Sequence, residues 1–229
     1  MPAWRKRWAS HVTERLALLG DVHANAPALD AVLAAIDDAG ITAGVCTGDL
    51  VMRGMYPAAC IYAIRERDWP CSRGNTDHKA ATRTPRSPEH PKAKRPGSRS
   101  WTTAHLSHDH LEYLAALPMV ARVDVAGVRL AVMHGGPDDF TNAVDEHTTD
   151  EELRRRGDEI DADVIVSGHV HRQSVRRVGR RVFVNPGSVG EAIDGDRRPG
   201  WAWLEVDADG AVDVHLERVE RPLATVRER

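Results

Sequence analysis

The sequence LALLGDVHAN, residues 16–25, joins a short apolar run to a cluster of polar residues. The apolar run predicts a buried strand, which ends at Gly20-Asp21. Pro27 then begins a predicted helix that has apolar residues on one face and stops at Gly40. A buried strand followed at once by an amphipathic helix is typical of an α/β sheet, so we expect Asp21 at the end of a strand in such a sheet.

The same rhythm continues along the first half of the chain. Residues 45–47 predict a second strand ending at Gly48-Asp49, and residues 56–68 predict a helix. Residues 69–72 predict a third strand, which ends at a turn formed by Gly74-Asn75. Alternation of strands and helices predicts a mostly parallel sheet with covering helices.

The second half is richer in β-structure. We predict a hairpin at residues 120–132, a helix at 150–160 and a buried strand at 164–166. Two further hairpins are predicted to turn at residues 178–180 and 209–210. The first hairpin leads to His134, and the buried strand ends at Gly168-His169.

The length of the chain fits one large domain or two small ones, and no convincing linker divides it. The chain has 229 residues, of which 41% are hydrophobic and 28% charged, an ordinary globular balance. We expect a flexible leader at residues 1–14, a single domain at 15–220 and a tail at 221–229. The formal net charge of −3 argues against general attraction to nucleic acid or to anionic membranes. We therefore expect neither a stable nucleic-acid complex nor a membrane partner.

Residues 79–100 interrupt the domain with a basic insertion. They contain four prolines and seven Lys or Arg residues, against the single acid Glu89. Such a segment cannot bury a core, so we expect a mobile loop. It is either a solvated insertion or a lid that collects anions.

Cys46, Cys60 and Cys71 form an odd set without CxxC spacing. This pattern indicates neither a disulfide framework nor a thiolate zinc site. We expect a reducing, cytoplasmic location.

Polar side chains that can bind metal follow five of the predicted strands. They are Asp21, His23, Asp49, Asn75, His134, His169 and His171. The carboxyl ends of parallel strands border the ligand crevice of an open sheet. Each signal alone is weak, because such residues are often turns or helix caps. Together, four imidazoles, two carboxylates and one amide oxygen have the composition of a two-metal site for first-row divalent ions.

Charge and order suggest roles within such a site. Asp49, central in order, can bridge two ions about 3.5–4 Å apart. His169 and His171 would point the same way in extended chain and can address neighbouring ions. A hydroxide bridging the ions would be a nucleophile near neutral pH that needs no separate protein base.

Six motifs, in this order, resemble those of the calcineurin-like metallophosphoesterases: GDVHAN, GDLVMRG, RGNTD, VMHGGP, SGHVHRQ and VNPGSVG. The likeness covers residues 16–207 and is greatest to the small bacterial and archaeal phosphodiesterase branch. It implies a four-layer α/β/β/α sandwich. It also implies metal-dependent hydrolysis of phosphate esters, above all phosphodiesters, by a metal-bridging hydroxide in a dinuclear site.

The resemblance also implies how the ligands divide between two divalent ions. One ion would be held by Asp21, His23, Asp49 and His171, and the other by Asp49, Asn75, His134 and His169. Asn75 would face the substrate phosphate as well. Manganese, iron, zinc and nickel are all compatible, with manganese favoured.

Two positions depart from the family pattern. The family commonly has a histidine after the asparagine, thought to protonate the leaving group or contact phosphate, where this chain has Thr76. His78 is the candidate catalytic residue in its place, and a site without a proton donor is the alternative. Arg53 stands where an uncharged residue is frequent; it is a candidate substrate contact, with a merely exposed arginine as the alternative.

Other functions stay open. A phosphomonoesterase or protein phosphatase is the nearest alternative, and a nuclease would use the basic insertion to follow a backbone. The same fold is a non-catalytic scaffold in the retromer coat subunit, where ligand positions are degraded, whereas all seven are present here. The expected partner is a small phosphate ester, and the oligomeric state, including a homo-oligomer, is open.

Overall fold

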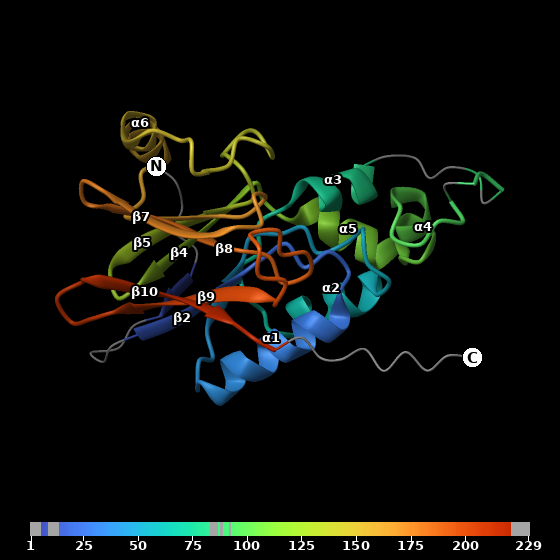
Figure 1. Ribbon diagram of the computed structural model, residues 1–229, viewed down its shortest axis with the longest axis horizontal. Helices are drawn as coiled ribbons and strands as arrows, with labels where there is room; N and C mark the ends of the chain where they lie inside the picture. Colours follow the sequence, from blue (N-terminus) through green and yellow to red (C-terminus); the bar gives the residue numbers. More distant parts are fainter. Residues whose placement is uncertain (1–5, 9–13, 83–86, 88, 92, 221–229) are drawn as a thin grey trace.

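The computed structural model describes residues 6–8, 14–82, 87, 89–91 and 93–220. Two β-sheets lie face to face, and helices cover the outer face of each (Figure 1). This arrangement confirms the four-layer α/β/β/α sandwich. None of the helices in these described ranges is both long and apolar enough to cross a membrane.

The smaller sheet has four strands in the order β10-β9-β2-β3. Their bounds are Glu14–Leu19 for β2, Gly44–Cys46 for β3, Gly200–Val206 for β9 and Val212–Arg218 for β10. β2 and β3 are parallel, and β9 pairs antiparallel with β2. The predicted parallel pair is therefore extended by a hairpin from much later in the chain.

The larger sheet has six strands in the order β1-β4-β5-β6-β8-β7. The bounds are Lys6–Trp8 for β1, Val120–Val125 for β4, Val128–Met133 for β5, Val164–Ser167 for β6, Arg181–Pro186 for β8 and Gln173–Val178 for β7. β5, β6 and β8 are parallel, while β4 and β7 join as antiparallel hairpins. β1, which lies inside the expected leader, pairs in parallel with β4.

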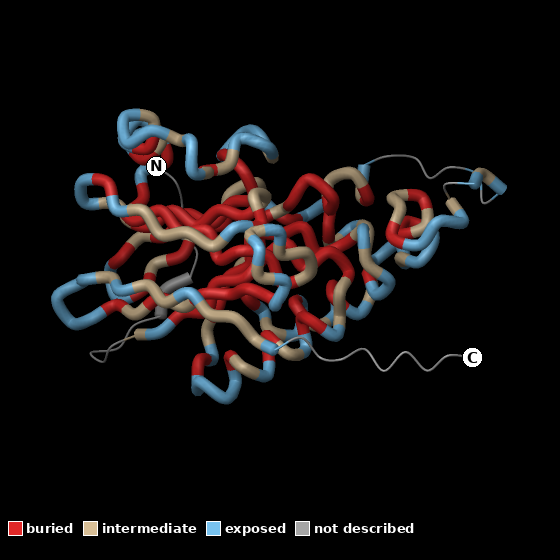
Figure 2. The backbone as a smooth tube through the Cα atoms, viewed as in Figure 1, coloured by how far each residue is buried: buried red, intermediate tan, exposed pale blue. Residues whose placement is uncertain are grey.

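Strand β2 is buried on both faces, which explains its unbroken apolar run. Leu16 and Leu18 belong to the core between the two sheets. Ala17 and Leu19 belong to a second core under the helices, together with Leu29 of α1 (Ala26–Asp38). Alternate residues of a strand point to opposite faces, so both faces had to be apolar. Figure 2 shows this buried interior running through both sheets.

Helices fill the outer layers. α1 and α2 (Pro57–Glu66) lie outside the smaller sheet, and α6 (Asp150–Ile160) lies outside the larger one (Figure 1). The predicted helix at residues 150–160 is thus confirmed. Its N-cap is Thr149, whose side chain accepts the backbone N–H of Glu152.

The segment that connects β3 of the smaller sheet to β4 of the larger one differs from the prediction in three places. The expected third strand at residues 69–72 is reduced to one bridge between Cys46 and Cys71, because Pro70 has no N–H for a ladder. Asn75 is the first residue of helix α3 (Asn75–Thr82) and not part of a turn. The spacing of Leu111, Leu114 and Leu117 predicts a helix at residues 105–117, and the structure has the shorter helix α5 (His108–Ala116), which Ser107 caps.

The basic insertion is helical at both ends. α3 continues to Thr82, and α4 (Arg99–Ala104) begins inside the predicted loop. Residues 83–86, 88 and 92, where loop mobility was expected, lie outside the described residues.

Candidate metal centre

The seven predicted ligands come together at one end of the sandwich. They follow β2 (Asp21, His23), β3 (Asp49), β5 (His134) and β6 (His169, His171), and begin α3 (Asn75). β2 and β3 belong to the smaller sheet, while β5 and β6 belong to the larger one. The ligands therefore come from two facing sheets and not from the strand ends of one open sheet.

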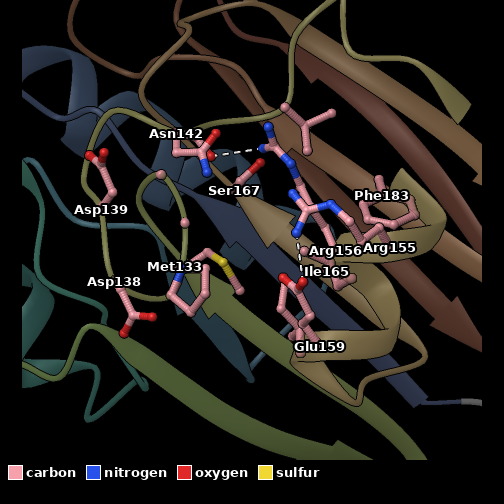
Figure 3. Close-up of a pocket in the computed structure, with 15 residues that line it drawn as sticks. Met133, Asp138, Asp139, Asn142, Arg155, Arg156, Glu159, Ile165, Ser167 and Phe183 are labelled. Carbon is pink, nitrogen blue, oxygen red and sulfur yellow. Dashed lines mark hydrogen bonds and ion pairs between the residues drawn. The ribbon is translucent and has the colours of Figure 1, made fainter. Parts of the chain in front are cut away.

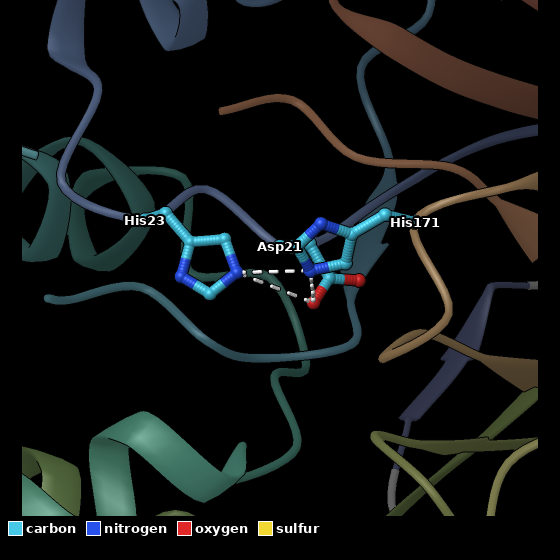
Figure 4. A group of neighbouring side chains, drawn as sticks. All are labelled: Asp21, His23 and His171. Carbon is cyan, nitrogen blue, oxygen red and sulfur yellow. Dashed lines mark hydrogen bonds and ion pairs between the residues drawn. The ribbon is translucent and has the colours of Figure 1, made fainter. Parts of the chain in front are cut away.

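One group of ligand atoms is formed by Asp21, His23 and His171 (Figure 4). His171 Nε2 lies 3.2 Å from Asp21 Oδ1 and 3.0 Å from His23 Nε2. His23 Nε2 is 3.8 Å from the same carboxylate oxygen. All three side chains are buried, and their ligand atoms are close enough to hold one metal ion.

A second group is formed by Asn75, His134 and His169. His134 Nε2 lies 3.2 Å from Asn75 Oδ1 and 3.1 Å from His169 Nδ1, and the last two atoms are also 3.1 Å apart. Ligand atoms that each lie about 2.1 Å from one ion are about 3.0–3.4 Å from one another. The spacing of these three atoms fits a bound divalent ion.

The Asn75 amide has two useful orientations. Its oxygen faces both imidazoles, which suits a cation between the three atoms. Rotated by half a turn, its nitrogen would donate to both rings, and its oxygen would accept from Thr76 N at 3.0 Å and from Lys79 Nζ at 3.1 Å. Lys79, which the sequence analysis considered only as part of the basic insertion, thus lies beside this group.

Asp49 lies between the two groups. Its Oδ2 atom is 3.7 Å from His23 Nε2 and 3.6 Å from His134 Nε2. Its Oδ1 atom accepts the backbone N–H of Thr76 at 2.8 Å. A single carboxylate oxygen therefore faces one histidine of each group.

The backbone around the site is unusual. Five of the predicted ligands have positive φ values between 50° and 70°, namely Asp21, His23, Asp49, His169 and His171. Such a conformation is costly for residues other than glycine, and it concentrates at functional sites. His169 and His171 are therefore not in extended chain as predicted. They address different groups because the backbone turns between them.

The charges suit metal binding. Burial alone would raise the pKa of Asp21, but the hydrogen bond with His171 and three nearby imidazoles lower it to about 2. Burial lowers the pKa of His23 and of His169, which favours neutral imidazoles. Burial also works against a charged His171, but its contact with Asp21 outweighs this and raises its pKa.

Backbone carbonyls orient two of the imidazoles. His134 Nδ1 lies 3.1 Å from the carbonyl oxygen of Thr47, and His171 Nδ1 lies 2.7 Å from that of Glu191. A ring whose Nδ1–H donates to a carbonyl presents the lone pair of Nε2 to the site. In both residues Nε2 is the atom that faces the other ligands.

Asp77 is a site residue that the sequence analysis missed. Its buried carboxylate accepts backbone N–H groups from Asp49 at 2.8 Å, Leu50 at 2.9 Å and Gly74 at 3.0 Å. Burial raises its pKa to about 7, and the bonds from Gly74 and Leu50 oppose that shift. The only sequence signal was its place in the motif RGNTD.

The two positions that depart from the family pattern, Thr76 and Arg53, and the candidate donor His78 each have a different environment. Thr76 is buried, and its hydroxyl donates to the carbonyl of Val51 at 2.9 Å. The ring of His78 packs against that of Phe140, with centroids 5.1 Å apart. Arg53 forms an ion pair with Glu191.

A separate cavity of about 180 Å³ lies between α6 and the larger sheet (Figure 3). Its floor is apolar, and Arg155 and Arg156 at its rim are paired with Glu152. None of the seven predicted ligands lines it. This cavity is therefore distinct from the candidate metal centre.

The fold and the site define an α/β/β/α protein with a buried histidine and carboxylate centre suited to metal ions. The family model for the calcineurin-like phosphoesterase superfamily domain matches residues 15–209 of the chain. The chain therefore belongs to this superfamily.

Relatives extend over nearly the whole chain. The uncharacterized protein MJ0912 of Methanocaldococcus jannaschii is 25% identical over 95% of this chain and 92% of its own length. A metallophosphoesterase from Sphaerobacter thermophilus has a TM-score of 0.73 and 28% identity, over 92% of this chain and 90% of that one. The hypothetical protein PH1004 from Pyrococcus horikoshii has a TM-score of 0.77 at 20% identity, over 91% and 89%.

Proposed function

We propose that this protein hydrolyses phosphodiesters with the help of two divalent metal ions. The observation that carries the proposal is the position of Asp49, whose Oδ2 atom lies 3.7 Å from His23 Nε2 and 3.6 Å from His134 Nε2. A carboxylate so placed is suited to bridge two ions. The fold alone would also serve a scaffold, but a scaffold needs no converging set of buried ligands.

The residues divide into two sets. Asp21, His23, Asp49 and His171 would hold one ion; Asp49, Asn75, His134 and His169 would hold the other. Bound ions of this kind, with manganese favoured, polarise a phosphoryl group and acidify water. The chain itself contributes position and exclusion of water, because Asp77 fixes the loop of Asp49 and six of the seven proposed ligands, all but His169, are buried.

The pairing of Arg53 supports diesters over monoesters as the proposed substrates. A monoester is a dianion and needs more positive charge than the monoanionic diester. The guanidinium of Arg53, expected to contact substrate, is already paired with Glu191. Asn75 remains the neutral contact proposed for the substrate phosphate, and His78 remains the candidate proton donor.

The experiment combines metal analysis with a substrate panel. Protein purified without chelator should contain two equivalents of divalent metal per chain, and it should hydrolyse bis-p-nitrophenyl phosphate faster than p-nitrophenyl phosphate. Protein that holds two ions but prefers the monoester would overturn the diester assignment. A metal-loaded protein inactive on both esters, on cyclic nucleotides and on oligonucleotides would favour the scaffold.

A further inference from the structure

Two adjoining cavities open beside His23. The first, of about 330 Å³, is lined by His23, Tyr56 and Met55 among others. The second, of about 640 Å³, includes Ile193. Both are lined by Asn25, Gly190 and Glu191, so they form one groove. We call this groove, which leads away from the candidate metal centre at His23, the His23 groove.

Exposed hydrophobic side chains gather along the His23 groove. Five large hydrophobic side chains are exposed among the described residues, and three of them line it: Met55 at 52%, Tyr56 at 53% and Ile193 at 58%. Tyr62, at 60%, lies outside it and donates to Glu66. Exposed apolar side chains that gather in a concave site, next to a few polar groups, are typical of ligand recognition.

The walls of the groove are held in place before any ligand binds. Asn25 Nδ2 donates to the carbonyl of Gly190 at 3.1 Å, and this bond joins the two sides. Arg53 has a φ of 69°, and its N–H donates to the carbonyl of Gly97 at 2.7 Å. A wall fixed by such contacts loses little conformational entropy on binding.

We propose that the His23 groove binds one arm of the phosphodiester, and that this arm is large, flat and mainly apolar, such as an aryl group or a nucleoside. This inference rests on the proposed function, because the phosphate at the metal centre places the arm. Tyr56 and Met55 offer an apolar surface to a ring face, while the ion pair of Arg53 and Glu191 borders the groove as a polar group beside its edge. A methyl arm would leave nearly all of the groove unfilled.

The test uses three diesters with the same p-nitrophenolate leaving group and a methyl, phenyl or thymidine retained arm. We expect Tyr56→Ala to lower kcat/KM for the phenyl and thymidine esters about tenfold, since stacking on an aromatic side chain has that magnitude. The methyl ester should be unaffected. Tyr62→Ala is the matched control and should change none of the three. The three esters share the p-nitrophenyl leaving arm. An equal loss of kcat/KM for all three would therefore mean that the groove holds the leaving arm and not the retained arm.

Binding of products gives a readout that does not depend on turnover. By calorimetry, the wild type should bind thymidine 5′-monophosphate more tightly than methyl phosphate, and Tyr56→Ala should remove this preference. Equal affinities in the wild type, or a preference that survives Tyr56→Ala, would overturn the groove assignment even if diesters are hydrolysed. If no diester is hydrolysed but the preference holds and depends on Tyr56, the proposed reaction fails while the groove stands.

Discussion

The carboxylate of Asp77 accepts a hydrogen bond from the backbone N–H of Asp49 at 2.8 Å. The same oxygen accepts the N–H of Gly74 at 3.0 Å, and the other oxygen accepts that of Leu50 at 2.9 Å. One buried side chain thus joins the loop after β3 to the start of α3. A carboxylate has acceptor capacity for all three donors, which an amide lacks.

Asp77→Asn should therefore weaken metal binding. The amide would turn an N–H group towards a backbone N–H and shift the loop that carries Asp49. Residues that support ligands in this way typically change metal affinity 10–100-fold. Isothermal titration with Mn²⁺ measures the effect. Asp109→Asn, at an exposed site paired with Arg65, is the control, and equal affinities in the two variants would contradict the positioning role.

Asp49→Asn should damage both proposed ion sites. The amide is neutral, so the bridge between the two groups loses its charge. We expect metal content to fall below one equivalent and diester hydrolysis to fall by at least about 10³-fold, while the circular dichroism spectrum stays that of a folded protein. Near-normal turnover with added Mn²⁺ would show that the two-metal proposal is wrong.

Metal removal should lower thermal stability. An ion that binds only the folded state adds RT ln(1 + [L]/Kd), or about 2.7 kcal/mol at a hundred times Kd. For a domain of this size, that corresponds to a fall in Tm of about 5–10 °C with EDTA. Asp49→Asn should show a much smaller fall, and an equal fall in both proteins would place the stabilising ion elsewhere.

Gly97→Ala should disturb substrate binding through Arg53. Gly97 has a φ of 72°, and a Cβ there would lie 2.2 Å from the carbonyl oxygen of Arg53. The wall of the His23 groove would have to move, so we expect KM for large-armed diesters to rise several-fold with little change in kcat. Gly179→Ala is the control, because Gly179 has a φ of 61° but nothing within 4 Å of its Cβ position. A similar rise in both variants would mean that backbone strain alone is responsible.

The rate of diester hydrolysis should depend steeply on the pKa of the leaving group. The Thr76 hydroxyl already donates to Val51, and it is not acidic enough to supply a proton near neutral pH. General acid catalysis contributes about 10²–10⁴-fold, most for basic leaving groups. We expect fast hydrolysis of aryl diesters and slow hydrolysis of alkyl diesters.

His78→Phe tests the remaining candidate donor. The phenyl ring can keep the contact with Phe140 but cannot carry a proton. If the dependence of the rate on leaving-group pKa is unchanged in this variant, His78 is not the proton donor. A steeper dependence in the variant would assign the proton to His78.

The fold was predictable where the signal is local. The apolar run of β2 is readable because both faces of that strand are buried. The hairpins at residues 178–180 and 209–210 carry glycine at their turns. By contrast, β9 pairs with β2 across most of the chain, and nothing in either strand specifies its neighbour.

The residues of the candidate site could be picked out from the sequence, but the geometry in which they meet could not. The ligand residue types stand out because polar residues directly follow apolar strands. The left-handed backbone of His169 and His171 has no decisive sequence signature, since only glycine adopts positive φ readily and other residues, histidine included, do so in a small minority of positions. Asp77 was missed for a related reason, because its partners are backbone N–H groups, which every residue except proline has. The His23 groove depends on exposure, which only the packed chain determines.

His23 and His171, whose Nε2 atoms are 3.0 Å apart, are separated by 148 residues of sequence. Contacts of such long range form slowly, because the chain must close a large loop before they stabilise it. The candidate metal centre therefore cannot exist in a nascent chain that has not yet added β6 and the residues that follow it. If it holds ions as proposed, metal loading is a late step in the maturation of the protein, and a truncated product would be unable to retain them.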